Sequence, residues 1–268
     1  MFKLLVTDVD GTLLDAKSKL SELNKKAIKE CMASGIKVII ATGKTIDSIR
    51  HLISELDLKL PQITMNGASI VTSSGEIIES IKFPRELYID FLRDIRSKNY
   101  EPTVATSDGS LFCIKYVDNM KAMVDSGEKL KIVEDLEAPF FIDNTVSISV
   151  PMPATDPMDP YIREKYGSKL LVVRSGEFFF DCLNLNASKG NALKKLIKTM
   201  GIKKEEVVSF GDSHNDISLF NASGLKIAVK NSFPELLEIA DIITDENYKS
   251  GLGTAIYKYI LKKDQIQP

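Results

Sequence analysis

Two aspartates near the N-terminus, Asp8 and Asp10, have the types and spacing to do chemistry together. They stand two positions apart at the end of a predicted strand, so their side chains are expected to leave on the same side. Neighbouring carboxylates repel each other, and a divalent cation relieves that repulsion. Because carboxylate oxygens are hard ligands, the expected ion is Mg²⁺. One carboxylate could then attack a phosphorus atom while the other transfers a proton.

Further polar groups stand at the ends of other predicted elements. They are Thr42-Gly43, Asn66-Gly67 and Gly211-Asp212 after strands, and Lys189 at the start of a helix. Ligands bind beyond the carboxyl ends of the strands in an open parallel sheet, so these groups are expected to converge on Asp8. The Thr42 hydroxyl and the Lys189 ammonium can hold phosphoryl oxygens. Asp212 and Asp216 would add carboxylates, and the glycines let backbone amides approach an anion.

The segments that would position these residues alternate between strand and helix in both outer thirds of the chain. Apolar runs predict strands at 2–7, 36–41, 61–65, 207–210, 225–229 and 240–244. Helices are predicted from Ser21 to Gly35, over 46–56 and 189–200, and from Pro234. Alternation of this kind predicts an α/β fold, a Rossmann-like parallel sheet with helices on its faces.

The middle of the chain has a different order of predicted helices and strands. Hairpins are predicted for 68–71 with 76–81, and around the turns at 108–109 and 175–176. Strands are expected at 102–106, 111–116, 145–150, 170–174 and 177–183, and helices after Pro84, near 118–127 and at 158–166. We therefore predict a core made of residues 1–83 and 184–268, interrupted by an α+β cap domain at 84–183.

Composition excludes several classes of protein. The 268 residues carry a net charge of −2, which offers no global field for nucleic acid. No run of 18 apolar residues predicts a membrane span, and the first apolar run is too short for a signal peptide. Three separated cysteines are a poor disulfide framework. We expect a cytoplasmic monomer or homodimer that binds a small phosphorylated metabolite.

The ordered motifs resemble those of the haloacid dehalogenase superfamily. Residues 8–14 (DVDGTLL) resemble its first motif, 39–43 its second, 189–193 its third and 211–216 its fourth. The long insert between the second and third motifs resembles the type IIB cap of the Cof-like sugar-phosphatase subfamily. The resemblance covers nearly the whole chain and implies a hydrolase of phosphoric monoesters.

The resemblance also implies a role for each matching residue. Asp8 would be the nucleophile that forms an aspartyl-phosphate, and Asp10 the general acid and base. The implied metal ligands are Asp8, the backbone carbonyl of Asp10, and Asp212, with Asp216 and Asn215 in supporting positions. The implied phosphate- and substrate-binding residues are Thr42, Gly43, Lys189, Asn66 and Asn215. The expected function is Mg²⁺-dependent hydrolysis of sugar phosphates or related metabolites.

Two positions depart from the family pattern. Lys44 stands where the family often has arginine, which replaces a bidentate anion contact with a point charge. Prolines 153, 157 and 160 are expected to shorten or delay a helix of the cap, whose residues touch the leaving group.

The sequence supports the alternative functions to different degrees. Thr42-Gly43-Lys44-Thr45 hints at a P-loop, but that motif needs glycine at 38, where the chain has valine. A transporting ATPase lacks its membrane span here, and a dehalogenase does not need the acid–base group at Asp10. A phosphomutase resembling the phosphomannomutase branch and a catalytically silent phosphate-binding regulator both stay open.

Overall fold

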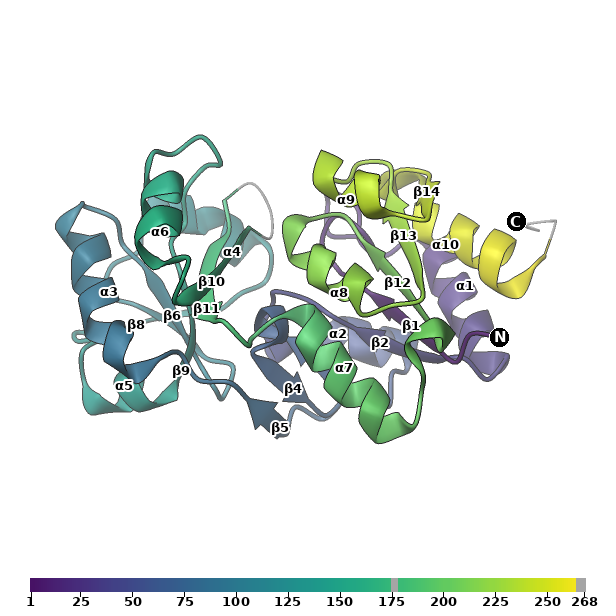
Figure 1. The fold of residues 1–268 in the computed structure, drawn as a ribbon, viewed down its shortest axis with the longest axis horizontal. Helices are drawn as coiled ribbons and strands as arrows, with labels where there is room; N and C mark the ends of the chain where they lie inside the picture. The colour runs from purple at the N-terminus through teal and green to yellow at the C-terminus, as the bar shows by residue number, and fades with distance from the viewer. Residues whose placement is uncertain (175–177, 264–268) are drawn as a thin grey trace.

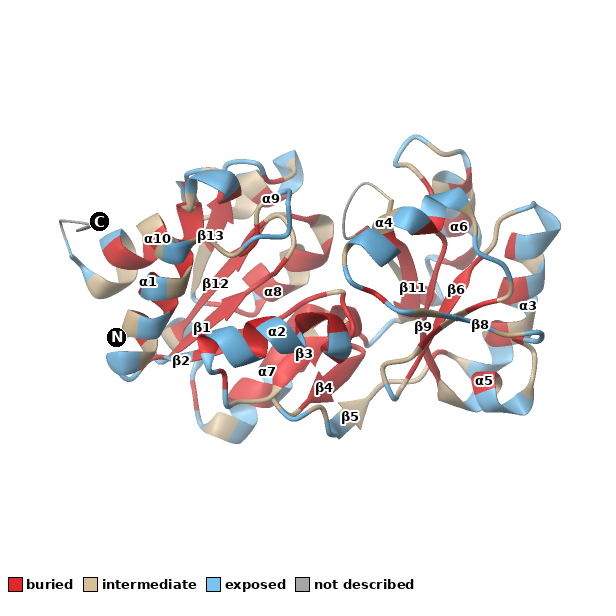
Figure 2. Cartoon of the chain, turned by 180° about the vertical axis from the view of Figure 1, so that it is seen from behind, coloured by how far each residue is buried: buried red, intermediate tan, exposed pale blue. Residues whose placement is uncertain are grey.

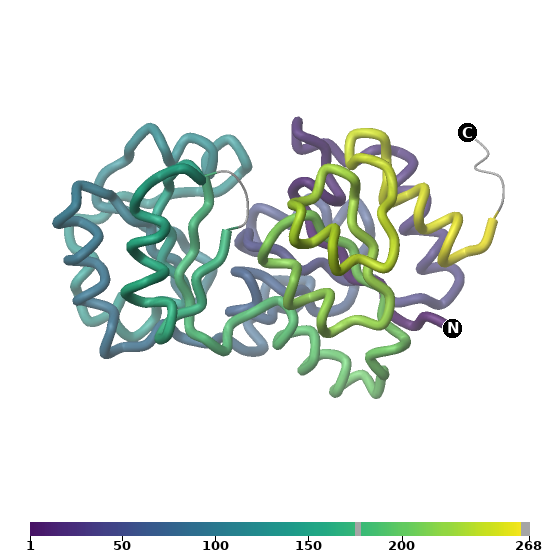
Figure 3. The backbone as a smooth tube through the Cα atoms, turned by 45° about the horizontal axis from the view of Figure 1, so that its top comes forward, coloured from purple at the N-terminus to yellow at the C-terminus, as the bar shows by residue number. Residues whose placement is uncertain are grey.

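A computed structural model describes residues 1–174 and 178–263 of the chain. Its elements form two lobes that lie side by side (Figure 1). We call the lobe built around strands β1, β2 and β12–β14 the core lobe, and the lobe built around β6–β11 the cap lobe. The N-terminus and the last described residues both lie at the end of the core lobe that is remote from the cap lobe (Figures 1 and 3).

The core lobe contains a five-stranded sheet in which every pairing is parallel. The order is β14-β13-β12-β1-β2. Its strands are β1 (Leu4–Thr7), β2 (Lys37–Ile40), β12 (Val207–Gly211), β13 (Leu225–Val229) and β14 (Ile242–Thr244). Thr7 lies opposite Phe210 on one side and Ile40 on the other, so β1 ends between two neighbouring strand ends. The predicted α/β fold with a parallel sheet is confirmed.

Helices cover both faces of this sheet, which explains why its strands are continuous apolar runs. Leu5, Val38 and Phe210 pack in one cluster with α1, α2 and α10, while Leu4 and Val6 pack on the opposite face with α7 and α8. The helices are α1 (Glu22–Ala33), α2 (Ile46–Leu56), α7 (Lys189–Met200), α8 (Ile217–Asn221), α9 (Pro234–Ile239) and α10 (Gly251–Ala255), the last continued by a π-helical stretch (Ile256–Leu261).

The third predicted strand of the first segment does not extend the parallel sheet as expected. Instead it begins an antiparallel sheet of β3 (Gln62–Thr64), β4 (Ser69–Val71) and β5 (Ile77–Ser80). A single bridge links β3 to the residue after β2. Asn66, with φ of 55°, lies in the short 3₁₀ turn after β3 and helps to reverse the chain into β4.

The cap lobe is built on a six-stranded sheet in the order β10-β11-β9-β6-β7-β8. All its pairs are antiparallel except β7 with β8. Its strands are β6 (Thr103–Thr106), β7 (Leu111–Cys113), β8 (Leu130–Ile132), β9 (Thr145–Ser149), β10 (Leu170–Arg174) and β11 (Phe180–Asn184); its helices are α3 (Arg85–Ser97), α4 (Lys121–Asp125), α5 (Pro139–Asn144) and α6 (Met158–Tyr166). Strand β8 and helix α5 were not predicted, and the predicted turn at 175–176 lies outside the described residues.

Alternate residues of the cap strands face opposite ways. Val104, Ile148 and Phe180 pack against residues of α3, α5 and α6 in a buried cluster. The residues next to each of these in sequence point to the opposite face of the cap sheet, and several of them line a cavity against the core lobe. Figure 2 shows the buried residues concentrated along the strands of both lobes. The cap sheet therefore has one face for its own core and one face for the site.

Candidate active site

Asp8 lies at the centre of the predicted site because of the strand order. It follows the end of β1, between the ends of β12 and β2, and its backbone N–H donates to Phe210 O at 3.1 Å. Asp212 follows β12 directly, and Lys189 is the first residue of α7. The carboxyl edge of the parallel sheet thus brings Asp8 together with two motifs that lie roughly 180 to 200 residues further along the sequence.

Three carboxylates form a tight acidic cluster at this edge. Oxygens of Asp8, Asp212 and Asp216 all lie within 4.8 Å of one another. The Lys189 ammonium, which is 0% exposed, donates to Asp8 Oδ1 at 2.6 Å and to Asp216 Oδ1 at 2.7 Å. One lysine therefore balances only part of the charge of three buried acids.

The rest of the cluster is held by short local contacts. The second oxygen of Asp216 accepts backbone N–H groups from Asp212 at 3.0 Å and Ser213 at 3.1 Å. The Thr12 hydroxyl donates to Asp212 Oδ1 at 2.6 Å. Asp8 Oδ2 and Asp212 Oδ2 accept no hydrogen bond from the described part of the chain. Asp216 thus organises its neighbours, whereas Asp8 and Asp212 each keep an oxygen for a ligand.

Glycine is required beside this cluster. Gly11 has φ of 81°, and a Cβ there would lie 2.4 Å from Asp212 Oδ2. The turn that follows Asp10 can approach the Asp212 carboxylate only because residue 11 has no side chain.

The electrostatics of the cluster favour a cation. Burial raises the pKa of Asp8 to about 7, against the opposing effect of Lys189. Burial also raises the pKa of Asp212, and repulsion from Asp8 and Asp216 adds to that rise. Burial acts to lower the pKa of Lys189, but Asp216 and Asp8 outweigh it and the pKa is raised. A divalent cation would offset the excess negative charge, so these residues fit the predicted Mg²⁺.

Asp10 does not join the acidic cluster. Its side chain is 44% exposed, and its Oδ2 lies 3.3 Å from the Lys44 ammonium. Strand β1 ends at Thr7, so the two-residue alternation that predicted parallel side chains stops before Asp10 is reached. Asp10 is therefore the more solvated of the two N-terminal acids.

The second motif contributes buried groups next to Asp10. Thr42 is fully buried, and its Oγ1 accepts the backbone N–H of Lys44 at 3.1 Å. The Lys44 ammonium also donates to Ser126 O of the cap lobe at 2.7 Å. Lys44, which stands where the family often has arginine, thus joins Asp10 to the cap lobe.

Two asparagines link the acidic edge to the cap sheet. The Asn215 amide donates to Asn66 Oδ1 at 2.8 Å, and the Asn66 amide donates to Asp181 Oδ2, also at 2.8 Å. Asn215 Oδ1 is buried and has no hydrogen-bond partner among the described residues. An acceptor of this kind beside the cavity is available to a substrate hydroxyl.

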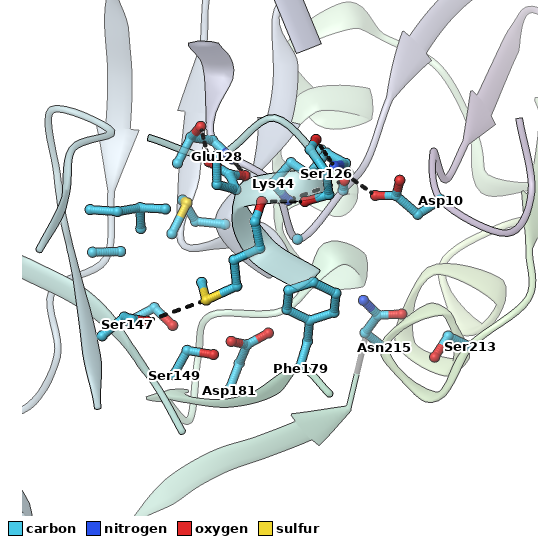
Figure 4. Close-up of a pocket in the computed structure, with 18 of the residues that line it drawn as sticks. Asp10, Lys44, Ser126, Glu128, Ser147, Ser149, Phe179, Asp181, Ser213 and Asn215 are labelled. Atoms are coloured by element: carbon cyan, nitrogen blue, oxygen red, sulfur yellow. Dashed lines mark hydrogen bonds and ion pairs between the residues drawn. The ribbon is translucent and has the colours of Figure 1, made fainter. Parts of the chain in front are cut away.

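A cavity between the lobes unites these groups. It is lined by Asp8, Asp10, Thr42, Gly43 and Asn215 of the core lobe and by residues of the cap sheet. Figure 4 shows Ser147, Ser149 and Asp181 on one side of it and Asp10 and Asn215 on another. The structure places every predicted site residue at or beside this cavity, with Lys189, Asp212 and Asp216 beneath its acidic end.

Several residues of the site were absent from the sequence prediction, among them Thr12, Ser126, Glu128 and Asp181. Thr12 had a signal, since its hydroxyl stands inside the first motif. Ser126, Glu128 and Asp181 had none, because they reach the site through contacts with residues 82 to 115 positions away.

Comparison with known proteins gives a consistent set of relatives. A family model described as haloacid dehalogenase-like hydrolase matches residues 5–256. The putative phosphatase YxeH of Bacillus subtilis is 30% identical, over 98% of this chain and 100% of its own. The 5-amino-6-(5-phospho-D-ribitylamino)uracil phosphatase YcsE of the same organism is 30% identical over 97% and 96%. The HAD subclass IIB sugar phosphatase BT4131 has a similar fold, with a TM-score of 0.82 at 21% identity over 96% and 98%.

No helix within residues 1–174 and 178–263 is both long and apolar enough to cross a membrane.

Proposed function

Since the chain belongs to the haloacid dehalogenase-like hydrolase family, as its four motifs predicted, we propose that it hydrolyses phosphate monoesters through an aspartyl-phosphate at Asp8. Phosphatase activity on a small phosphorylated substrate follows from relatives that are named as phosphatases. The proposal adds the mechanism, the metal and the class of ester.

The observation that carries the proposal is the environment of Asp8. Lys189 fixes one of its oxygens at 2.6 Å, while the other accepts no hydrogen bond from the described residues, and Asp8 lines the cavity. A carboxylate that is held at one oxygen and unengaged at the other is oriented for attack on a phosphorus atom.

Asp8 and Asp212 are the residues that would hold Mg²⁺, with the Asp10 backbone carbonyl as a further predicted ligand and Asp216 in a supporting position. A bound Mg²⁺ ion would offset negative charge that develops on the phosphoryl oxygens. Thr42, Gly43 and Lys189 would bind the same oxygens with hydroxyl, backbone and ammonium groups.

The proposed reaction has two displacements. In the first, an Asp8 oxygen forms a bond to phosphorus, the bond from phosphorus to the leaving oxygen breaks, and Asp10 gives its proton to that oxygen. In the second, Asp10 takes a proton from water as the water oxygen attacks phosphorus, and the bond to Asp8 breaks to release phosphate. Asp10 suits the proton-transfer role because it borders the cavity and is partly solvated.

The proposed substrates are sugar phosphates or related metabolites, bound with the leaving group in the cap half of the cavity. A cytoplasmic monomer or homodimer, and the division into residues 1–83 with 184–268 and 84–183, are proposed with it.

The test is phosphate release from p-nitrophenyl phosphate and a panel of sugar and nucleotide monophosphates, with Mg²⁺ or EDTA. We expect release to require Mg²⁺ and to fall by about 10³-fold or more in Asp8→Asn, because the amide is not a nucleophile. Asp57→Asn is a matched control, since Asp57 is exposed on the core surface. Release that survives in Asp8→Asn would exclude the aspartyl-phosphate; no release from any ester by the wild type would favour the phosphomutase or the silent regulator.

A further inference from the structure

The face of the cap sheet that borders the cavity carries a row of polar side chains. Thr103, Ser149 and Asp181 stand directly opposite one another on β6, β9 and β11. Residues opposed in this way project from the same face of a sheet. All three line the cavity and are at most 9% exposed. The row therefore presents two hydroxyls and one carboxylate to whatever occupies the cap half of the cavity.

The next row of the same face is less polar. Ala105 lies opposite Ser147 two residues further along the strands, and both line the cavity. Apolar side chains complete this wall; they are Met65, Leu111, Met123 and Phe179. A wall with hydroxyls on one part and apolar surface on the other suits a leaving group with both hydroxyls and C–H faces.

The charges around the cavity have an unequal distribution. The cap lobe contributes two acids, Asp181 and Glu128, and among the described lining residues the only cation is Lys44. The Lys44 ammonium is already engaged by Ser126 O at 2.7 Å and lies 3.3 Å from Asp10. The cap wall thus contributes negative charge without a lysine or arginine of its own.

Arg174 projects from the other face of the cap sheet. It lies opposite Phe180, on the alternate face of the sheet from Asp181, and its guanidinium sits 5.0 Å from the centre of the Phe180 ring. That guanidinium also donates to Asp159 at 2.8 Å and to Met152 O at 3.2 Å. Its charge is used on the face that packs against the cap's own helices.

We infer that the cavity selects phosphate monoesters whose leaving group is an uncharged or cationic polyol and discriminates against those with a second anionic group, with Asp181 as a specificity-determining residue. The inference rests on the proposed function and names the substrate class within it. A carboxylate or second phosphate in the cap half would meet a buried acid of like charge, in an environment where charges are weakly screened. The hydroxyls of Thr103, Ser147 and Ser149 would instead hydrogen-bond a polyol.

The same charge distribution bears on the phosphomutase alternative. A mutase that works through a sugar bisphosphate must hold the second phosphate in the leaving-group half of its cavity. Such a group is recognised by arginine or lysine clusters, and the described cap wall has none. The negative charge of the cap wall therefore also predicts a low kcat/KM for sugar bisphosphates.

The test compares esters that differ mainly in charge. We would measure kcat/KM with Mg²⁺ for glucose 6-phosphate, glucosamine 6-phosphate, 6-phosphogluconate and fructose 1,6-bisphosphate. For the two esters with anionic leaving groups, kcat/KM should be about 10- to 100-fold lower than for glucose 6-phosphate. This is the range expected for one weakly screened like charge at several ångströms. Glucosamine 6-phosphate should equal or exceed glucose 6-phosphate.

Asp181→Asn is the decisive variant, because asparagine keeps an acceptor for the Asn66 amide while removing the charge. It should raise the ratio of kcat/KM for 6-phosphogluconate to kcat/KM for glucose 6-phosphate about tenfold. The corresponding ratio of glucosamine 6-phosphate to glucose 6-phosphate should fall. Asp143→Asn removes the same charge from an exposed cap position and should leave both ratios unchanged.

Binding of the same esters to Asp8→Asn protein, measured by calorimetry with Mg²⁺, reports the charge preference without turnover. Absence of hydrolysis by the wild type, together with a retained charge preference in binding, would therefore overturn the proposed function alone. Equal affinity for anionic and neutral esters, or an Asp181→Asn variant whose ratios match the wild type, would overturn the inference.

Discussion

Replacing Glu128 with alanine should loosen the cap lobe from the core lobe while leaving the acidic cluster intact. Glu128 is only 7% exposed, and its carboxylate lies at the N-terminus of core helix α2. One oxygen accepts the Thr45 N–H at 3.0 Å and the Ser48 hydroxyl at 2.8 Å, and the other accepts the Thr45 hydroxyl at 2.7 Å. The partial positive charge at the start of a helix favours a carboxylate in this position.

The magnitude follows from these three hydrogen bonds. Each bond to a charged group is worth about 1.5–3 kcal/mol, but the donors on α2 regain water when the lobes separate. We therefore expect a net loss of about 2–4 kcal/mol, which shifts the balance between closed and open forms by roughly 30- to 900-fold. Lys44 should lose its position as well, since its ammonium is held by Ser126 O, two residues before Glu128.

The assay combines kinetics and scattering. In Glu128→Ala, kcat/KM for sugar phosphates should fall, and small-angle scattering with the phosphate mimic fluoroberyllate should show a more extended molecule than the wild type. Glu134→Ala removes an exposed cap glutamate and is the matched control. Wild-type kcat/KM together with an unchanged scattering curve in Glu128→Ala would refute the view that this contact holds the cap in place.

Three further predictions concern the acidic cluster and the acid–base residue. Lys189→Met breaks a fully buried double ion pair, so it should lower the free energy of unfolding by about 3–5 kcal/mol. The unfolding temperature in EDTA should then fall by roughly 6–15 °C, and added Mg²⁺ should restore part of the loss. In EDTA the wild type should lose stability as pH rises from about 4 towards 7, because burial raises the pKa of Asp8 to about 7 and the unfolded chain gives up that proton first; calorimetry with Mg²⁺ should show a smaller fall. Asp10→Asn should lower kcat far more for sugar phosphates than for p-nitrophenyl phosphate, whose phenolate leaves without a proton; equal losses on both esters, by phosphate release, would argue against Asp10 as the acid.

Local signals in the sequence predicted several elements to the residue. Helix α7 begins after Ser188, whose hydroxyl accepts the Asn191 N–H at 3.2 Å, and ends at Gly201 in the left-handed region. The bounds of α2, β10 and β13 also match their predictions. Helix α7 has strong caps, α2 has a continuous apolar face, and β10 and β13 are mostly apolar, so each is specified by residues within or next to its own span.

Elements without such signals were missed or misplaced. Strand β8 is only three residues long and largely exposed, so its apolar–polar alternation is too short to distinguish it from a loop. Strand β3 makes only one parallel bridge, to the residue after β2, and its main partner is β4, which it reaches through the turn around Asn66 in a left-handed conformation. Pairing depends on where the chain goes next, and periodicity within a strand does not record that.

The same limit divides the predicted site. The acidic cluster could be predicted because each of its members stands in a motif at the end of an element, and a parallel sheet must bring those ends together. Glu128 and Asp181 belong to no motif, and they reach the site only through the packing of one lobe on the other. The sequence therefore predicts the acidic cluster but not the cap surface that lines the cavity.

This division between the lobes has a consequence for how specificity can change. The proposed nucleophile, the proposed proton-transfer group and the acids suited to a cation all lie in the core lobe, near the ends of parallel strands that share one hydrogen-bonded sheet. The row of Thr103, Ser149 and Asp181 lies on a different sheet, whose buried core is separate. Substitutions in that row need not disturb the strand ends that position Asp8. Altering the row should therefore change which ester is cleaved, while the route through Asp8 stays the same.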